Sequence, residues 1–134
     1  MITIEDILND RKFSKLKLIN NQVDLGRRVS SIESTETPDV ASYLTPNTFL
    51  LTTGMSYADN QDALCDLIIE LNQLPCAALG IKLGRFIEKL DPKVIETANK
   101  LNFPLIQIPL DITLGKIFHD LLGHLWDHQN EQLL

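Results

Sequence analysis

The sequence has no apolar run approaching the roughly 18 residues that a membrane-spanning helix requires. Residues 1–6 also lack the basic start and apolar centre of a signal peptide. We therefore expect a cytoplasmic protein that does not contact a membrane. Only two cysteines are present, Cys65 and Cys76, and their spacing matches no metal-binding or redox motif. This scarcity predicts two reduced thiols and no disulfide.

Positive charge is also scarce. The chain carries 12 Lys and Arg against 18 Asp and Glu, for a net charge of −6. Modules that grip a nucleic-acid backbone usually present a basic face, so this balance argues against nucleic-acid binding by this chain. Basic clusters do occur at residues 11–17 and at Arg27-Arg28. We expect both clusters to be solvated surface, as most charge clusters are.

Signatures of catalysis and of bound cofactors are missing as well. The sequence contains no phosphate-binding loop, no dinucleotide fingerprint and no Gly-x-Ser-x-Gly nucleophile turn. Its histidines all fall near the C-terminus, where His124 and His128 lie four residues apart beside Asp120. No distal ligand accompanies them, so we expect surface histidines rather than a metal site. These absences predict a protein that is not an enzyme and needs no cofactor.

What the sequence does contain is a series of short apolar runs separated by helical patterns. Residues 48–52, 77–83 and 104–109 predict buried strands, and the first two runs end in turns with glycine. Helical patterns follow both turns, with caps expected at Asp59 and at Asp91-Pro92. A chain of 134 residues suits one domain. We therefore predict a single α/β domain whose mainly parallel sheet is flanked by helices.

Shorter elements are expected in the first third of the chain. Thr3 and Asp6 have the spacing of a capping box, which predicts a helix over residues 4–9. Residues 16–19 and 28–34 predict two more strands, the second near the sheet edge. Pro38 is well placed to open a further helix that runs to residue 44.

The C-terminal segment predicts an amphipathic helix from about residue 113 to residue 129 or beyond. We accordingly divide the chain into an α/β domain over residues 1–112 and a terminal helix over residues 113–134. An apolar stripe of this width docks on the domain's own sheet, packs on another chain, or does both. We expect docking on the sheet and treat the stripe as a candidate dimer interface. Its members are Leu114, Ile117, Phe118, Leu121, Leu122 and Leu125.

The two glycine turns are the first place to look for a ligand, because ligands gather at the carboxyl ends of parallel strands. Hydroxyls, free backbone amides and cations there could hold a small polar or anionic metabolite. On the residues alone, an equally good interpretation is that the glycines only permit tight turns and the cations are solvated. The candidate ligand-binding residues are Glu36, Asp39, Thr52, Thr53, Gly54, Lys82, Gly84 and Arg85.

Four blocks, at residues 36–39, 50–54, 79–85 and 103–109, carry a resemblance to a known family. The chain resembles the N-terminal domain of the purine catabolism regulator (PucR-type) family of bacterial transcription regulators. The resemblance runs from residue 3 to the terminal helix and implies a sensory domain that responds to a small molecule, with purine-catabolism intermediates as candidate ligands. The competing hypothesis is a dimerisation or protein-interaction module that binds no metabolite.

The resemblance also implies partners. Regulators of this family resemble other dimeric regulators in needing two DNA-binding heads, so a homodimer is expected. DNA would be bound only through a helix-turn-helix outside this chain, because no second helical pair follows residue 113. We therefore expect the sensory portion of a regulator, with the terminal helix leading toward an output region.

Overall fold

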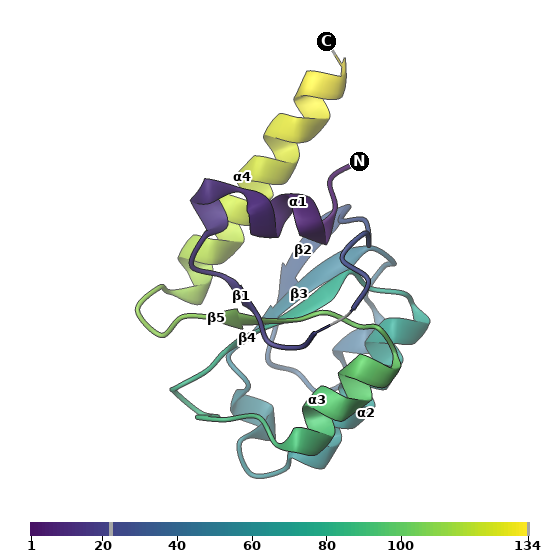
Figure 1. Cartoon of the computed structure of the whole chain (residues 1–134), viewed down its shortest axis with the longest axis vertical. Coiled ribbons are helices and arrows are strands. Elements are labelled where there is room, and N and C mark those ends of the chain that lie inside the picture. Colours follow the sequence, from purple (N-terminus) through teal and green to yellow (C-terminus); the bar gives the residue numbers. More distant parts are fainter. Residues whose placement is uncertain (22, 134) are drawn as a thin grey trace.

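A five-stranded sheet forms the centre of the computed structural model, which describes residues 1–21 and 23–133 (Figure 1). The strand order is β1-β5-β4-β3-β2, with β2 to β5 parallel and β1 antiparallel to β5. The predicted α/β domain with a mainly parallel sheet is confirmed. The strands are β1 (Lys17–Leu18), β2 (Ser31–Ser34), β3 (Thr48–Thr52), β4 (Ala78–Lys82) and β5 (Leu105–Ile108).

Helices cover both faces of this sheet. Figure 1 shows α2 and α3 on one face and α1 and α4 on the other. Each pair of helices buries its apolar side against the strands, which gives two separate cores. Strands buried on both faces are continuously apolar, as the central strands are here. The helices are α1 (Ile4–Asn9), α2 (Gln61–Gln73), α3 (Pro92–Lys100) and α4 (Leu114–Leu133).

The pleat of β3 assigns its side chains to the two cores in turn. Leu50 packs in the α2/α3 core, whereas Phe49 and Leu51 pack in the α1/α4 core. On the neighbouring strand, a Cβ placed at Gly80 would lie 3.0 Å from Leu51 Cδ2 and 3.2 Å from Ile108 Cδ1. A larger residue here would press on the side chains of β3 and β5, which close over this position.

The helix starts follow the sequence closely, with one shift. The capping box of α1 is confirmed: Thr3 Oγ1 accepts a hydrogen bond from the Asp6 amide at 3.2 Å, and Asp6 Oδ2 accepts one from the Thr3 amide at 2.9 Å. The hydrogen bond from the Thr3 amide lowers the pKa of the Asp6 carboxyl. Pro92 opens α3 as predicted. For α2, however, the cap is Asn60 rather than Asp59, because the Asn60 side chain accepts from the Ala63 amide.

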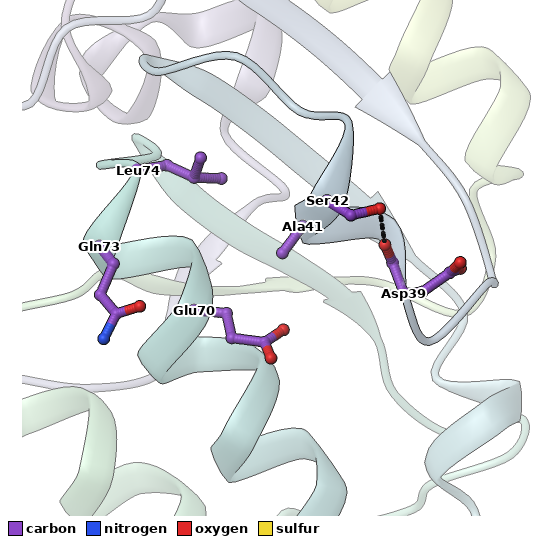
Figure 2. A pocket seen from close by; sticks show the side chains of 6 residues that line it. All are labelled: Asp39, Ala41, Ser42, Glu70, Gln73 and Leu74. Carbon is purple, nitrogen blue, oxygen red and sulfur yellow. Dashed lines mark hydrogen bonds between the residues drawn. The ribbon is translucent and has the colours of Figure 1, made fainter.

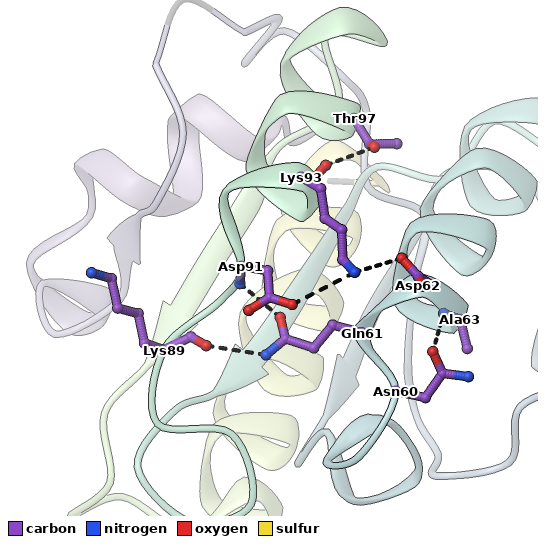
Figure 3. A network of polar contacts seen from close by, with 8 residues as sticks. All are labelled: Asn60, Gln61, Asp62, Ala63, Lys89, Asp91, Lys93 and Thr97. Carbon is purple, nitrogen blue, oxygen red and sulfur yellow. Dashed lines mark hydrogen bonds and ion pairs between the residues drawn. The ribbon is translucent and has the colours of Figure 1, made fainter.

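A polar network ties the starts of α2 and α3 together (Figure 3). The Gln61 side chain accepts a hydrogen bond from the Asp91 amide at 2.7 Å and donates one to the Lys89 carbonyl at 3.2 Å. Lys93 Nζ lies 2.6 Å from Asp62 Oδ1. The network fixes the two helices of one face relative to each other at the end where the strands terminate.

The helix predicted to begin at Pro38 is wrong. A single 3₁₀ turn, Val40–Ser42, takes its place. The Ser42 hydroxyl donates to the Asp39 carbonyl at 2.8 Å, which offers the backbone an alternative to helical bonding. Thr45 directly precedes Pro46, and the residue before a proline is disfavoured in helical conformation. The turn therefore does not extend into a helix.

The terminal helix α4 docks on the sheet, as expected. Ile117, Leu121 and Leu125 are buried in the α1/α4 core, and Leu114 and Phe118 are partly buried against it. Leu122 faces outward and is 43% exposed, and the neighbouring Trp126 is 63% exposed. None of the described helices is both long enough and apolar enough to cross a membrane.

Arg27 corrects the expectation that the Arg27-Arg28 pair is solvated surface. Its guanidinium donates to the Cys76 carbonyl at 3.0 Å, to Asn72 Oδ1 at 2.8 Å and to the Leu101 carbonyl at 3.2 Å. Burial lowers the pKa of Arg27. Nearby, burial raises the pKa of the Cys76 thiol to about 11. Both cysteines are free, as predicted, and Cys76 stays protonated at neutral pH.

Candidate functional site

The polar groups at the carboxyl end of β3 converge on one carboxylate, that of Glu36. The hydroxyls of Thr52 and Thr53 each donate to Glu36 Oε1 at 2.7 Å, and the Thr53 amide donates to Oε2 at 2.9 Å. The Ser56 hydroxyl donates to the Glu36 carbonyl. Four of the predicted ligand-binding residues are therefore gathered in one cluster, which we call the Glu36 cluster (Glu36, Thr52, Thr53 and Gly54).

Gly54 completes this cluster and shapes the turn. Its φ of +80° lies in the left-handed region that favours glycine. A Cβ at this position would lie 3.0 Å from Ile87 Cδ1, so the turn packs tightly against the loop that follows β4. The contact brings the two glycine turns singled out in the sequence side by side.

Lys82 does not join the Glu36 cluster. Thr52 pairs with Ile81 across the sheet, so Lys82, one residue further along, points to the opposite face. Its ammonium is buried on the α4 side, where the side chain is 8% exposed and Nζ donates to the Ile112 carbonyl at 2.8 Å. The sequence placed Lys82 at the correct strand end but could not show that the pleat separates it from Thr52.

Gly84 and Arg85 lie on the loop that packs against Gly54. Gly84 has a φ of +106° and faces Leu110, since a Cβ there would lie 3.3 Å from Leu110 Cδ2. Arg85 is exposed, and its guanidinium carbon lies 4.8 Å from the centre of the Phe86 ring. Both residues occupy the carboxyl-end rim of the sheet, as predicted, and the Arg85 side chain stacks on its own loop.

Asp39 lines a different concavity (Figure 2). This cavity of about 470 Å³ lies between the Val40–Ser42 turn and α2. Two acidic residues, Asp39 and Glu70, are among those that line it, so the cavity does not suit an anion. The other lining residues are Ala41, Ser42, Gln73 and Leu74.

The Glu36 carboxylate is an acceptor held in place by its neighbours. Oε1 takes both threonine hydroxyls, whereas Oε2 accepts only the Thr53 amide among the described residues. Glu36 is half-buried, and a carboxylate has about four lone-pair sites, so Oε2 has capacity for a further hydrogen bond. Within the described part of the chain, no cation lies at ion-pair distance from Glu36. Such a site suits groups that donate N–H bonds.

The electrostatic environment of the cluster extends to a buried phenol. Burial, and then the Glu36 charge, raise the pKa of Tyr57. Sequence reasoning missed both Ser56 and Tyr57. Neither residue type is unusual in a turn, and only the folded backbone shows that they neighbour Glu36.

The terminal histidines contact other groups. His124 Nε2 lies 3.8 Å from Asp10 Oδ2, and its ring packs edge-on against Phe13 with centres 5.3 Å apart. Within residues 1–21 and 23–133, no three His, Cys, Asp or Glu side chains are grouped so that they could hold a metal ion.

Comparison with known proteins gives two matches. The purine catabolism regulatory protein-like family, PucR, matches residues 6–125. The purine catabolism regulatory protein of Bacillus subtilis (strain 168) is 31% identical over 132 residues, which cover 98% of this chain. The chain spans 25% of the length of that relative. No solved structure matches the chain.

Proposed function

The chain belongs to the purine catabolism regulatory protein-like family, and from this premise we propose that it is the small-molecule-sensing regulatory domain of a bacterial transcription regulator. The observation that carries the proposal is the carboxylate of half-buried Glu36, which hydrogen bonds hold in place at the carboxyl end of β3. Nothing in the described residues points to catalysis. We propose that residues 1–112 sense the ligand and that DNA is bound by a part of the regulator outside this chain.

The chemistry of the Glu36 cluster supports one class of ligand. The free lone pair of Oε2 fits an N–H donor, and the negative charge of Glu36 disfavours an anion in direct contact. We therefore narrow the expected small polar or anionic metabolite, at this site, to a neutral ureide, amide or purine base. Arg85 on the adjoining loop is a further proposed contact, because it could donate to a carbonyl of such a ligand.

Transmission of the signal would use α4. This helix is packed on the sheet by Ile117 and Leu121 and continues past the sheet edge toward the C-terminus (Figure 1). A ligand that favours one conformation of the domain over another would, through α4, shift the conformational equilibrium of the output region. Activation and repression are both compatible with this route.

We expect Glu36→Gln to weaken ligand binding by about tenfold. Hydrogen bonds to charged groups contribute about 1.5–3 kcal/mol, and about 1.4 kcal/mol corresponds to a factor of ten. The measurement is isothermal titration of the wild-type and variant chains with hydantoin, hypoxanthine and N-methylurea. At least one of these probes is expected to bind the wild type saturably and to raise its melting temperature.

The matched control is Glu33→Gln, which makes the same charge change at an exposed residue of β2. Its affinity for the probe is expected to equal that of the wild type. The sensing site is contradicted if none of the three probes binds, or if Glu36→Gln and wild type bind equally well.

A second candidate function, a dimerisation module without a metabolite ligand, is favoured by a different observation. Leu122 and Trp126 are exposed on α4 beside a cavity of about 440 Å³ that β2 and α4 form. Large apolar side chains exposed together often mark an interface. We expect Trp126→Ser to shift a concentration-dependent dimer toward monomer in sedimentation velocity, with no change in melting temperature. A wild-type chain that stays monomeric across the dilution series would rule this function out.

A further inference from the structure

A third cavity, of about 570 Å³, lies on the α1/α4 side of the sheet, opposite to the face that carries Thr52. Its floor is apolar: Phe13 is 1% exposed, and Leu16 and Ile117 are each 4% exposed. The volume falls within the range of about 300–1,000 Å³ typical of small-molecule sites. We call this the α4 cavity, because its wall includes the first turns of α4.

The rim of the α4 cavity is cationic. Lys12, Lys15 and Lys116 line it, together with Asp111 and Asp120. Lys15 Nζ lies 3.4 Å from Asp111 and Lys116 Nζ 2.9 Å from Asp120, in pairs whose lysines are each 65% exposed. Exposed pairs of this kind contribute little stability, so either ammonium can turn toward a ligand.

Lys12 has no such counter-charge. Its ammonium lies 5.9 Å from the centre of the Phe13 ring, and within the described ranges no carboxylate is at ion-pair distance from it. It is nevertheless close enough to Asp120 to contribute, after Lys116, to lowering the pKa of that carboxyl. Lys12 therefore adds unpaired positive charge at the mouth of the cavity.

A fourth lysine, Lys82, contacts the cavity lining without being part of it. Buried Lys82 donates to the carbonyl of Ile112, and Ile112 is part of the cavity lining. No carboxylate in the described part of the chain lies at ion-pair distance from Lys82. Three lysines and two aspartates thus line the cavity, and a fourth lysine contacts its lining, within a chain of net charge −6. The residues around the cavity therefore carry a net positive charge, although the chain as a whole is negatively charged.

We propose that the α4 cavity binds a small amphiphilic carboxylate. An aromatic or branched apolar group would lie on the floor of Phe13, Leu16 and Ile117, and the carboxylate would lie between Lys12 and Lys116. This ligand differs in charge and in location from the neutral ligand proposed for the Glu36 cluster, and the two sites lie on opposite faces of the sheet. The inference therefore does not depend on the proposed sensing of ureides.

The position of the cavity gives such a ligand direct access to α4. Lys116, Ile117 and Asp120 belong to the first two turns of that helix. Thr113 caps the helix, and its hydroxyl accepts from the Lys116 amide at 3.2 Å. A carboxylate held at this end is also favoured by the helix dipole. Occupancy of the cavity would fix the beginning of α4 against the Arg11–Phe13 turn.

Phenylacetate is the probe, and two-dimensional NMR of the ¹⁵N-labelled chain is the measurement. We expect saturable shifts of the amide signals of Lys12, Phe13, Lys116 and Ile117. Lys12→Gln and Lys116→Gln are each expected to weaken binding by about fivefold at low salt, as the loss of one favourable charge contact predicts. Lys17→Gln, which removes an exposed lysine that does not line the cavity, is expected to leave the affinity unchanged.

Phenylacetamide, which has the same shape without the charge, separates this proposal from simple filling of an apolar hollow. It is expected to bind more weakly than phenylacetate by about fivefold or more. Equal affinity for the two probes would overturn the proposal, as would shifts that do not saturate or equal effects of all three lysine variants. The ureide titration tests the Glu36 cluster, and the phenylacetate titration tests the α4 cavity on the other face of the sheet. One proposal can therefore fail while the other holds.

Discussion

Leu121→Asp is expected to leave the chain unfolded at 25 °C, whereas Leu122→Asp is expected to fold normally. The two leucines are adjacent in α4, but Leu121 is 1% exposed in the α1/α4 core and Leu122 is 43% exposed. Truncating a buried leucine costs about 2–5 kcal/mol, and burying an unpaired carboxylate adds to that cost. Small domains are stable by only about 5–15 kcal/mol in total, so the sum approaches the whole free energy of unfolding.

Circular dichroism and urea denaturation of both variants provide the measurement, with Leu121→Ala as an intermediate. Leu121→Ala is expected to lower the free energy of unfolding by about 2–5 kcal/mol and to remain folded. A Leu121→Asp chain with native helicity, but with altered sedimentation, would mean that this side of α4 packs on another chain instead of the sheet. Leu122→Asp shares the helix and the substitution, so it controls for effects on helix propensity.

Arg27→Ala is expected to lower the free energy of unfolding by about 2–3 kcal/mol, because it leaves three part-buried acceptors without their donor. Arg27 donates to the Cys76 and Leu101 carbonyls and to Asn72, close to the ends of α2 and α3. Its guanidinium also lies 5.1 Å from the centre of the Phe103 ring. One side chain thereby joins the C-terminal ends of two helices, where a cation is favoured.

Urea denaturation again measures the effect, and the neighbouring residue provides the control. Arg28 is exposed, so Arg28→Ala removes the same charge with an expected change within about 0.5 kcal/mol. Arg27→Lys keeps the charge but cannot bridge several acceptors with one planar group, and it should fall between the two. If Arg27→Ala and Arg28→Ala proved equally stable, the bridging role would be wrong.

Much of the fold could be predicted from local patterns. The capping box at Thr3 and Asp6, the Pro92 helix start and the continuously apolar run of β3 each specify an element through nearby residues alone. The wrong prediction of a helix at Pro38 also arose from nearby residues. A proline at a favourable position was outweighed by the Ser42 hydroxyl and by the proline that follows Thr45.

The candidate site was only partly predictable. The strand-end position of Thr52, Thr53 and Gly54 followed from the rule that ligands gather where parallel strands end. Glu36 was placed among their possible neighbours, and the structure shows its carboxylate holding both threonines. The α4 cavity was not predicted, because its lysines were interpreted as solvated charge and its floor comes from segments about 100 residues apart in the chain.

By itself, the sequence determined the order and type of the main elements, the mainly parallel sheet and the family. These depend on hydrophobic periodicity, caps and short motifs, all of which act over a few residues. Tertiary structure alone decided that Lys82 and Thr52 face opposite sides of the sheet, that Arg27 is half-buried and hydrogen-bonded while Arg28 is exposed, and that a cationic cavity lies at the foot of α4. Those features depend on strand register and on contacts between segments that are distant in the chain. Local sequence patterns specify neither of these, because both are set by the whole fold.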